Sequence, residues 1–353
     1  MRVAFVAMET THRRDTQGTR RLQRLARLLA DRGHEVRVYC TQWWDGGPGT
    51  VVENGVFYHG VVDSLSPTLF SLRVASLLPG MGADVVHASP RPPVGVLAAR
   101  AGGVLARAPL VVEWFGDEDV AASRLRSWAA TAPARVIVPS EMVRTRVREY
   151  GTLGENTQMI PESIDVEHLR QVDPAEDAPD IVYAHPMDDD ANVESLLLAL
   201  AELRDRDWSA AIVGDGPKRR DYQRQATDLR IDDRVSFPGE QSADERLALY
   251  RGAHVFVQTA RRAYFATDLL EALAAGCVGI VEYQAESSAH ELIENYERSF
   301  RVTSPEELAD AIVDAGRYPR TDFVESFERY DHEAVVAEYL ECYRELRAAH
   351  GVL

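Results

Sequence analysis

Short apolar runs alternate with segments of helical periodicity along the chain, and this alternation limits the fold more than any other feature. Residues Val3–Met8 form a run typical of a strand buried on both faces. Leucine and alanine then recur at helical spacing from Leu22 to Leu29, and Gly33 is placed to end that helix. Further strands are predicted at 36–40, 56–58, 84–88, 109–113 and 135–138, and further helices at 69–78, 94–107, 119–130 and 140–150. The alternation predicts an α/β fold with a parallel sheet covered by helices on both faces.

The pattern restarts at residue 180, so the chain is predicted to hold two domains. A polar stretch with two prolines, 171–179, is the predicted linker. Strands are predicted at 180–184, 209–213, 234–237, 254–257 and 278–282, and helices at 192–204, 217–230, 242–251, 266–275, 287–295 and 305–314. We expect domains at 1–170 and 180–331, and a closing helix within 332–353 that packs back toward the first domain. Two such doubly wound domains are expected to face a cleft with their strand ends and helix N-termini.

The charge balance excludes a general nucleic-acid binder, which needs a broad basic surface. The chain of 353 residues has 39 Lys+Arg against 56 Asp+Glu, a net charge of -17, and Lys218 is its one lysine. We interpret this composition as that of a salt-accumulating, haloarchaeal type of organism; the alternative is a GC-rich genome that encodes Arg in place of Lys. Residues 1–170 carry 20 basic and 18 acidic side chains, whereas residues 171–353 carry 19 and 38. This asymmetry indicates an anionic partner for the first half, unless the domains merely differ in composition.

The three cysteines, Cys40, Cys277 and Cys342, are far apart and match neither a metal-site spacing nor a disulfide framework. The sequence shows no signal-peptide pattern, and no apolar stretch reaches the ~18 residues of a membrane span. We therefore expect a cytoplasmic protein whose membrane contact, if any, is peripheral.

Several stretches, in order, resemble the retaining glycosyltransferases of family four, which have the GT-B fold of two facing Rossmann-like domains. Gln17–Val36 is similar to the family's opening glycine loop and first helix. Met159–Asp165 matches the end of its first domain, and Ile212–Pro217 is close to its Val-Gly-Asp-Gly-Pro turn. Leu270–Gly276 is also family-like, and the resemblance covers nearly the whole chain.

The resemblance implies a nucleotide-sugar donor bound mainly by the second domain. Glu271 would hold the ribose hydroxyls, because a carboxylate accepts two hydrogen bonds from a diol; the alternative is an exposed helix residue. Gly239 would face the base, and Gly18, just before a helix, would offer its amide to a phosphate. Gly214 is either a ligand contact or part of a plain strand-to-helix turn.

The sequence departs from the family where chemistry is concentrated. The first acid of the family's Glu-x7-Glu pair is Ala263, and the diphosphate-binding glycine is Ala266, which precedes Thr267 and still offers an N–H. The clamping Arg and Lys align with Pro186 and Ala191, and the first-domain His aligns with Phe115.

Other cations are available to bind a diphosphate. Arg261 and Arg262 are the first choice, because they lead into the expected phosphate loop and arginine binds paired oxygens; the alternative is a solvated pair in a surface loop. Further basic residues with this potential are Lys218, Arg13, Arg14 and Arg20.

Two residues are candidates for a catalytic role, Glu113 and His185. Glu113 could accept a sugar hydroxyl, although such acidic runs are mostly solvated, and a histidine beside a strand end is more often structural. Asp188–Asp190 could hold Mg²⁺ or cap the next helix, and we favour the cap, so no metal or other cofactor is expected.

The apolar segment 64–82, which has Arg73 as its single charge, and the arginine-rich first helix would suit a lipid-linked acceptor at an anionic membrane; the alternative is core packing. The predicted function is therefore transfer of a sugar from a nucleotide donor to a hydroxyl of a glycan or lipid-linked acceptor, with retention. The main alternative is a non-catalytic GT-B homologue that binds a nucleotide sugar or a partner enzyme. A sugar-nucleotide epimerase is a third reading.

Overall fold

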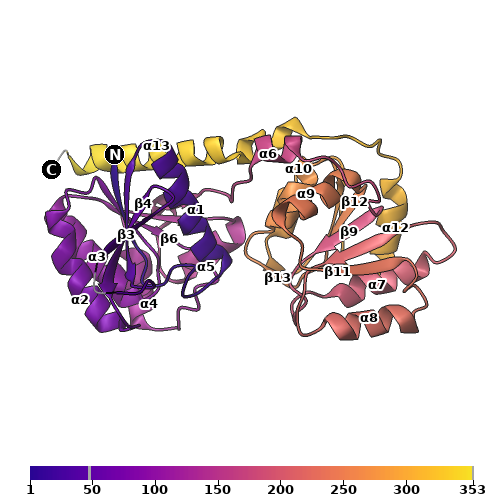
Figure 1. The fold of residues 1–353 in the computed structure, drawn as a ribbon, viewed down its shortest axis with the longest axis horizontal. Helices are drawn as coiled ribbons and strands as arrows, with labels where there is room; N and C mark the ends of the chain where they lie inside the picture. Colours follow the sequence, from indigo (N-terminus) through magenta and orange to yellow (C-terminus); the bar gives the residue numbers. More distant parts are fainter. Residues whose placement is uncertain (47–48, 352–353) are drawn as a thin grey trace. The chain divides into compact units, whose positions relative to one another are not determined.

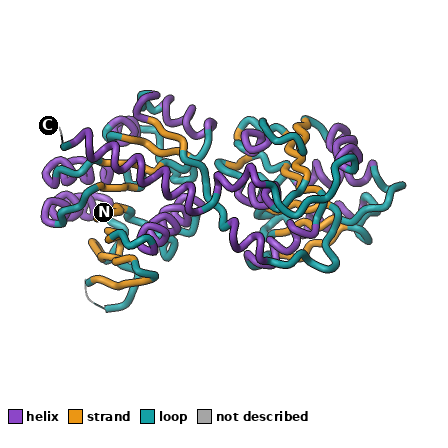
Figure 2. The backbone as a smooth tube through the Cα atoms, turned by 90° about the horizontal axis from the view of Figure 1, so that it is seen from above, coloured by secondary structure: helices purple, strands orange, loops and turns teal. Residues whose placement is uncertain are grey.

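The computed structural model describes residues 1–46 and 49–351, which form two compact α/β units. Unit 1 comprises Met1–Glu162 together with the residues from Glu333 onward, and unit 2 comprises Ser163–His332. In each unit helices pack against the faces of a central sheet (Figure 2). The predicted α/β class with parallel, Rossmann-like domains is confirmed.

Unit 1 contains an eight-stranded sheet in the order β3-β4-β2-β1-β5-β6-β7-β8, parallel except where β3 pairs with β4. Its strands are β1 (Arg2–Val6), β2 (Glu35–Thr41), β3 (Thr50–Glu53), β4 (Val56–Val62), β5 (Val85–Ala88), β6 (Leu110–Glu113), β7 (Arg135–Val138) and β8 (Thr157–Met159). Its helices are α1 (Gln17–Asp31), α2 (Pro67–Leu77), α3 (Pro93–Ala106), α4 (Arg124–Thr131) and α5 (Glu141–Glu149), with 3-10 turns η1 (Leu78–Gly80) and η2 (Gly154–Asn156).

The last helix, α13 (His332–His350), completes the core of unit 1. Its side chains Val336, Tyr339 and Tyr343 are buried in the same cluster as Leu25 and Leu29 of α1. Figure 1 shows α13, in yellow, lying along this unit. The predicted return of the closing helix to the first domain is therefore confirmed.

Unit 2 contains a six-stranded, fully parallel sheet in the order β11-β10-β9-β12-β14-β16. Its strands are β9 (Ile181–Ala184), β10 (Ala210–Val213), β11 (Val235–Gly239), β12 (Val255–Gln258), β14 (Val278–Glu282) and β16 (Ser299–Val302), and β13 (Arg262–Ala263) pairs separately with β15 (Glu286–Ser287). Its helices are α6 (Val166–Gln171), α7 (Val193–Glu202), α8 (Arg219–Asp228), α9 (Ala243–Gly252), α10 (Thr267–Ala274), α11 (Ala289–Ile293) and α12 (Pro305–Ala315), with the 3-10 turn η3 (Glu325–Tyr330).

The units divide at different residues from the predicted domains. The segment 171–179, predicted as the linker, packs within unit 2, where Ala175 N donates to Ala248 O at 3.0 Å and Arg251 donates to Val172 O. These bonds to α9 satisfy backbone groups that a free linker would leave to water. The helix predicted at 119–130 begins only at Arg124, because the Ser123 side chain caps its first turn.

Within the described residues, no helix combines the length and the apolar character needed to cross a membrane.

Candidate functional site

Two loops at the carboxyl ends of β9 and β10 are joined by backbone contacts that require glycine. A Cβ on Gly214 would lie 2.2 Å from the carbonyl oxygen of His185, and one on Gly216 would lie 2.4 Å from that of Met187. Both glycines also have positive φ, 123° and 154°. Met187 N donates to Asp215 O at 2.9 Å, which closes the contact. Loop packing therefore explains the Gly-Asp-Gly turn, in agreement with the strand-to-helix alternative.

Gly239 lies at the same edge of the sheet. Its carbonyl accepts a 2.9 Å hydrogen bond from Gly214 N, so two of the predicted donor-site glycines are directly bonded. Arg219 reaches the same place and donates to Phe237 O at 2.6 Å. Three successive strand ends of unit 2 are thus tied into one backbone surface.

Three cations from two distant parts of the sequence gather around the loop that follows β9. Lys218 Nζ lies 3.0 Å from Asp189 Oδ1, and Arg262 Nη1 lies 3.3 Å from Asp190 Oδ2. Arg261 donates from Nη1 to Asp189 O at 3.1 Å. Their side chains keep 42%, 46% and 50% exposure, respectively, so solvent still reaches them. We call Lys218, Arg261 and Arg262 the cation cluster.

The loop after β9 carries small or rigid residues where the family has its two clamping cations. Ala191, which aligns with the family's Lys, is completely buried, whereas Pro186, which aligns with the Arg, is exposed. Asn192 has a left-handed backbone with φ 52°, and its side chain donates to Thr259 O at 3.0 Å and accepts from Arg261 Nη2 at 3.1 Å. Arg261 therefore fixes the loop at which the family residues would stand.

The acids Asp188–Asp190 mainly pair with cations and with their own loop. The N-cap of α7 is Asn192, so the expectation that one of these acids caps the helix is wrong. Asp188 instead accepts from Asp190 N at 2.9 Å, and the other two carboxylates contact the cation cluster. Across residues 1–46 and 49–351, no group of three or more His, Cys, Asp or Glu side chains is arranged to hold a metal ion.

Helix α10 begins next to the strand β13 that carries Arg262. Its N-cap is Ala266, which has no polar side chain to accept from the first-turn N–H groups, and Thr267 opens the helix. Glu271, one turn further, is partly exposed. Burial, followed by the charges of Asp268 and Glu271, holds the pKa of Tyr250 well above its ordinary value. Tyr250 donates to Asp268 at 2.8 Å. Asp268 and Glu271 thus place two negative charges near Tyr250.

His185 is partly exposed at the end of β9. Its ring Nδ1 lies 2.9 Å from the carbonyl oxygen of the next residue, Pro186. The candidate proton carrier is thus near the joined loops, with its imidazole held locally.

Glu113, the other catalytic candidate, is the buried counter-ion of Arg21. The expectation that it lies in a solvated acidic run is therefore wrong. Its side chain is 1% exposed and Arg21 is 3% exposed. Oε1 accepts from Arg21 Nε at 2.7 Å, and Oε2 accepts from the Tyr339 hydroxyl at 2.8 Å. His87 Nε2 lies 3.2 Å from Oε2, and its Nδ1 is 2.5 Å from the Tyr343 hydroxyl. These contacts join α1, β5, β6 and α13.

The Arg21 guanidinium has fixed partners on every side. It donates to the carbonyl oxygens of Ile160 at 2.7 Å and Pro161 at 2.8 Å, besides Glu113 and Tyr339. Burial alone would raise the pKa of Glu113, but Arg21, His87 and Tyr339 outweigh it and lower that pKa. Glu113 therefore stays charged and holds unit 1 together.

Gly18 is engaged by the chain itself. Its amide donates to Asp117 Oδ2 at 2.9 Å, and a Cβ at this position would lie 2.6 Å from Asp117 Oδ1. The predicted open phosphate contact is therefore replaced in this structure by an internal carboxylate at the N-terminus of α1. The side chain of Glu118 accepts from the amides of Phe115 at 2.6 Å and Gly116 at 2.8 Å. Burial and the neighbouring Asp117 charge raise the pKa of Glu118 to about 8.

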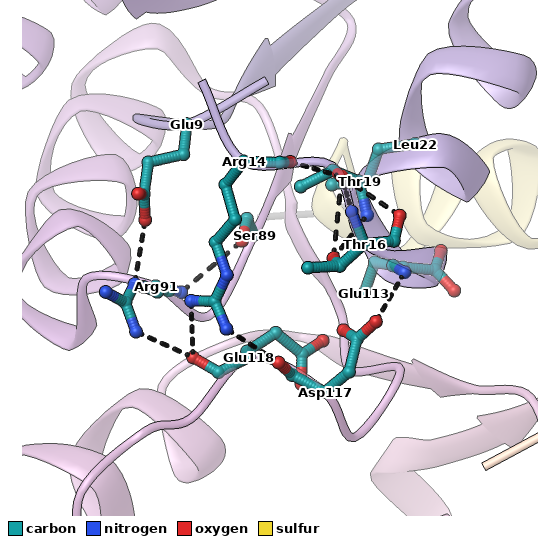
Figure 3. Close-up of a pocket in the computed structure, with 11 residues that line it drawn as sticks. Glu9, Arg14, Thr16, Thr19, Leu22, Ser89, Arg91, Glu113, Asp117 and Glu118 are labelled. Atoms are coloured by element: carbon teal, nitrogen blue, oxygen red, sulfur yellow. Dashed lines mark hydrogen bonds and ion pairs between the residues drawn. The ribbon is translucent and has the colours of Figure 1, made fainter. Parts of the chain in front are cut away.

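Two arginines fix this acidic loop. Arg14 donates to Asp117 O at 3.0 Å, while Arg91 donates to Glu118 O at 3.2 Å and pairs with Glu9 at 2.7 Å (Figure 3). Arg14 also pairs with Asp119 at 2.8 Å. They surround a cavity of about 20 Å³, which has room for about one water molecule. Six of the lining side chains are charged, and the side chains themselves fill most of the pocket.

Two family models match consecutive parts of the chain. Residues 18–168 match "Glycosyltransferase Family 4", and residues 165–322 match "Glycosyl transferases group 1". The chain belongs to the GT-B glycosyltransferases. Alpha-monoglucosyldiacylglycerol synthase of Streptococcus pneumoniae is 28% identical to this glycosyltransferase over 157 residues, 40% of this chain. The match spans about a third of that curated relative, 35% of its length.

Solved structures agree on the fold along nearly the whole chain. A glycosyltransferase from Rickettsia africae has a TM-score of 0.79 at 16% identity, covering 98% of both chains. Sucrose-phosphate synthase from Thermosynechococcus elongatus has a TM-score of 0.74 at 17% identity, covering 99% of this chain and all of that one. Anabaena HepE in complex with UDP has a TM-score of 0.73 at 18% identity, covering 98% and 100%.

Proposed function

We propose that this glycosyltransferase transfers a sugar from a nucleotide-sugar donor to an acceptor hydroxyl, with retention at the anomeric carbon. The observation that carries the proposal is the cation cluster, where Lys218, Arg261 and Arg262 meet at the loop after β9. The family resemblance places its diphosphate clamp on that loop. Anabaena HepE is solved with UDP and with UDP-glucose, which supports the choice of a nucleotide-sugar donor.

Each residue of the donor site has a proposed task. The cation cluster would replace the missing clamp and stabilise the negative charge of the departing diphosphate, where one such contact can contribute ~3–4 kcal/mol in the transition state. Its carboxylate partners would give way to phosphate oxygens. Glu271 would accept from the ribose diol, the backbone near Gly214 and Gly239 would face the nucleoside, and the N–H groups at Ala266 and Thr267 would meet a phosphate oxygen.

In the proposed reaction, the bond from the anomeric carbon to the diphosphate oxygen breaks, and the acceptor oxygen bonds to the same face of that carbon. The acceptor proton passes to the departing diphosphate, so no protein nucleophile is needed. The internal role of Glu113 agrees with this mechanism, because its two oxygens are held by Arg21 and Tyr339. We propose no metal in the reaction.

The acceptor is proposed to be a glycan or a lipid-linked sugar, with the enzyme peripheral to a membrane. The name of the Streptococcus relative, a monoglucosyldiacylglycerol synthase, supports a lipid-borne acceptor. The acidic composition supports work in concentrated salt, because the Debye length falls to ~3 Å at 1 M.

The test combines donor binding with detection of transfer in 2 M KCl. UDP-glucose and other nucleotide sugars are first screened for a thermal shift. Products formed on a panel of glycans and glycolipids are then identified by mass spectrometry. NMR gives the anomeric configuration of each product. We expect a shift and a retained product. Binding without transfer across the panel would contradict catalysis, and no binding of any nucleotide sugar would contradict the donor class.

A further inference from the structure

One buried carboxylate at the carboxyl edge of the unit 2 sheet has no cation beside it. Glu282 is the last residue of β14, and it is 9% exposed. Within residues 1–46 and 49–351, no arginine, lysine or histidine forms an ion pair with it, and its contacts are with the amides of Asn192 and Gln284. Glutamate is seldom buried without a cation, because removing its charge from water is costly. Glu113 of unit 1 differs, since Arg21 compensates its charge.

The hydrogen bonds to Glu282 are also fewer than its two oxygens can accept. Gln284 Nε2 donates to Oε1 at 2.8 Å. Asn192 Nδ2 lies 3.4 Å from Oε1 and 3.4 Å from Oε2, so its N–H is shared between the two oxygens at long range. A carboxylate offers about four acceptor positions, and among the described residues Oε2 has this long contact alone. Glu282 therefore keeps acceptor positions for hydroxyl or N–H groups of a ligand.

The Asn192 side chain is held at both ends, so it does not turn closer to Glu282. Its Nδ2 donates to Thr259 O at 3.0 Å, and its Oδ1 accepts from Arg261 Nη2 at 3.1 Å. The Thr259 hydroxyl also donates to Asn192 O at 2.8 Å, which fixes the backbone. One amide thus has Arg261 of the cation cluster on one side and Glu282 on the other. A ligand held by the cation cluster is therefore within one side chain of Glu282.

The chain that follows Glu282 runs beside Ala263, where the first acid of the family's pair is missing. Ser287 pairs with Ala263 in the ladder of β13 and β15, and Ser288 N donates to Ala263 O at 2.8 Å. Glu286 of the same ladder accepts from Arg262 Nε at 3.1 Å, so it belongs with the cation cluster. Of the two acids in residues 282–288, Glu282 is therefore the one without a cation.

We propose that Glu282 binds the sugar of the donor by accepting hydrogen bonds from two neighbouring hydroxyls. This assignment rests on the proposed function, because it takes the donor to be a nucleotide sugar whose diphosphate lies on the cation cluster. A sugar joined to that diphosphate reaches past Asn192, and the two carboxylate oxygens match a vicinal diol. The donor sugar is then one with two free adjacent hydroxyls. A sugar that lacks one of them leaves the buried carboxylate without its partner and is rejected.

The test compares UDP with UDP-glucose by isothermal titration calorimetry of the full chain in 2 M KCl. Glu282→Gln keeps the shape of the side chain and removes its charge. We expect this variant to bind UDP-glucose about 10- to 100-fold more weakly and UDP less than about twofold more weakly, because only the sugar loses hydrogen bonds to a charged group.

Deoxy analogues of UDP-glucose complete a double-mutant cycle with the same variant. Each analogue has hydrogen in place of one hydroxyl, at C2, C3 or C4 of the glucose. Two analogues altered at adjacent carbons should bind wild type about tenfold more weakly than UDP-glucose does. In Glu282→Gln the same two should bind about as well as UDP-glucose. If every deoxy analogue loses the same affinity in both proteins, Glu282 does not hold the diol.

The stability of the unliganded protein separates this role from a structural one. Removing a buried charge that has no cation should leave the thermal midpoint of Glu282→Gln unchanged or higher, whereas loss of a loop support would lower it. The matched control is Glu202→Gln, at the exposed end of α7 in the same unit, which should change neither ligand's affinity.

The outcomes distinguish this assignment from the proposed function. Equal losses for UDP and UDP-glucose with a lower midpoint would make Glu282 a structural residue and overturn the proposal. Unchanged UDP-glucose affinity in Glu282→Gln, with UDP still bound, would overturn it while leaving the proposed donor class intact. If wild type binds neither UDP nor UDP-glucose, the proposed donor and this assignment fail together.

Discussion

The two units differ in how their grouped charges are placed: Arg21 of unit 1 is buried, whereas the cation cluster of unit 2 is exposed. In unit 1, Arg21 is 3% exposed and its donors meet fixed acceptors on α13, β6 and the segment after β8. In unit 2, the side chains of the cation cluster are about half exposed. They pair with the carboxylates of Asp189 and Asp190 on a surface loop. A cation with every partner built into the core serves the fold. One that pairs with exposed acids can exchange them for a ligand.

The largest expected effect is on stability when the buried arrangement is broken. Arg21→Leu removes the partner of a buried carboxylate, which typically costs about 3–5 kcal/mol in the free energy of unfolding. Urea unfolding in 2 M KCl measures it. Tyr339→Phe, which removes one hydroxyl, should cost about 1–2 kcal/mol. Equal, small losses for both variants would show that Arg21 is not the centre of the network.

The second effect concerns the exposed cations. Arg261→Ala with Arg262→Ala should weaken nucleotide-sugar binding about 10- to 100-fold, because charge-assisted bonds to a diphosphate are lost. Unfolding free energy should change by less than ~1 kcal/mol, since exposed pairs contribute little. Isothermal titration calorimetry measures the affinity. Arg224→Ala, on the exposed pair with Asp221, is the control; unchanged affinity in the double variant would exclude these arginines as the clamp.

The third prediction concerns pH. The pKa of Glu118 rises from its ordinary 4.5 to about 8 in the folded protein. Between these values the folded state holds a proton that the unfolded state has lost, so this contribution to stability is complete below pH 4.5 and disappears as pH rises toward 8. The unfolding free energy of wild type minus that of Glu118→Gln, measured from pH 5 to 8.5, should fall as pH rises, because only the wild-type side chain loses a proton. A difference independent of pH would show that Glu118 is already ionised.

The smallest expected effect is that of salt on donor binding. Unit 2, residues 163–332, carries 36 acidic and 18 basic side chains, so a diphosphate approaches it against repulsion. Raising KCl from 0.2 M to 2 M should tighten binding a few-fold by screening it. In Asp189→Asn with Asp190→Asn, the gain should be smaller. Weaker binding at high salt in both proteins would show that attraction by the cation cluster dominates.

Periodicity was enough to predict the fold, because buried parallel strands such as β5 and β6 leave unmistakable apolar runs. It missed β3, β8 and β16, most of whose residues are exposed or only partly buried. The sequence does indicate that Arg21 is buried, because it lies on the same face of its helix as Leu22, Leu25 and Leu29. A charge on that face needs a buried partner. Its partner Glu113 is 92 residues away, and no local pattern connects them.

The cation cluster was predicted only in part. The position of Arg261 and Arg262 just before α10 predicts that they bind the diphosphate. Their contact with Asp189 and Asp190 cannot be predicted in this way, because it depends on the pairing of β9 with β12 in the sheet. The need for glycine at Gly214 likewise comes from a neighbouring loop, which composition cannot reveal.

The return of α13 to unit 1 also has a consequence for biosynthesis. Ribosomes make residues 163–332 before Tyr339 and Tyr343, so unit 2 has its full sequence while unit 1 still lacks the helix that bonds to Glu113 and His87. Domains of a chain usually fold in order of synthesis. Here the first unit to emerge is the last that can finish folding, because Glu113 and His87 receive their tyrosine partners only when the final helix has been made.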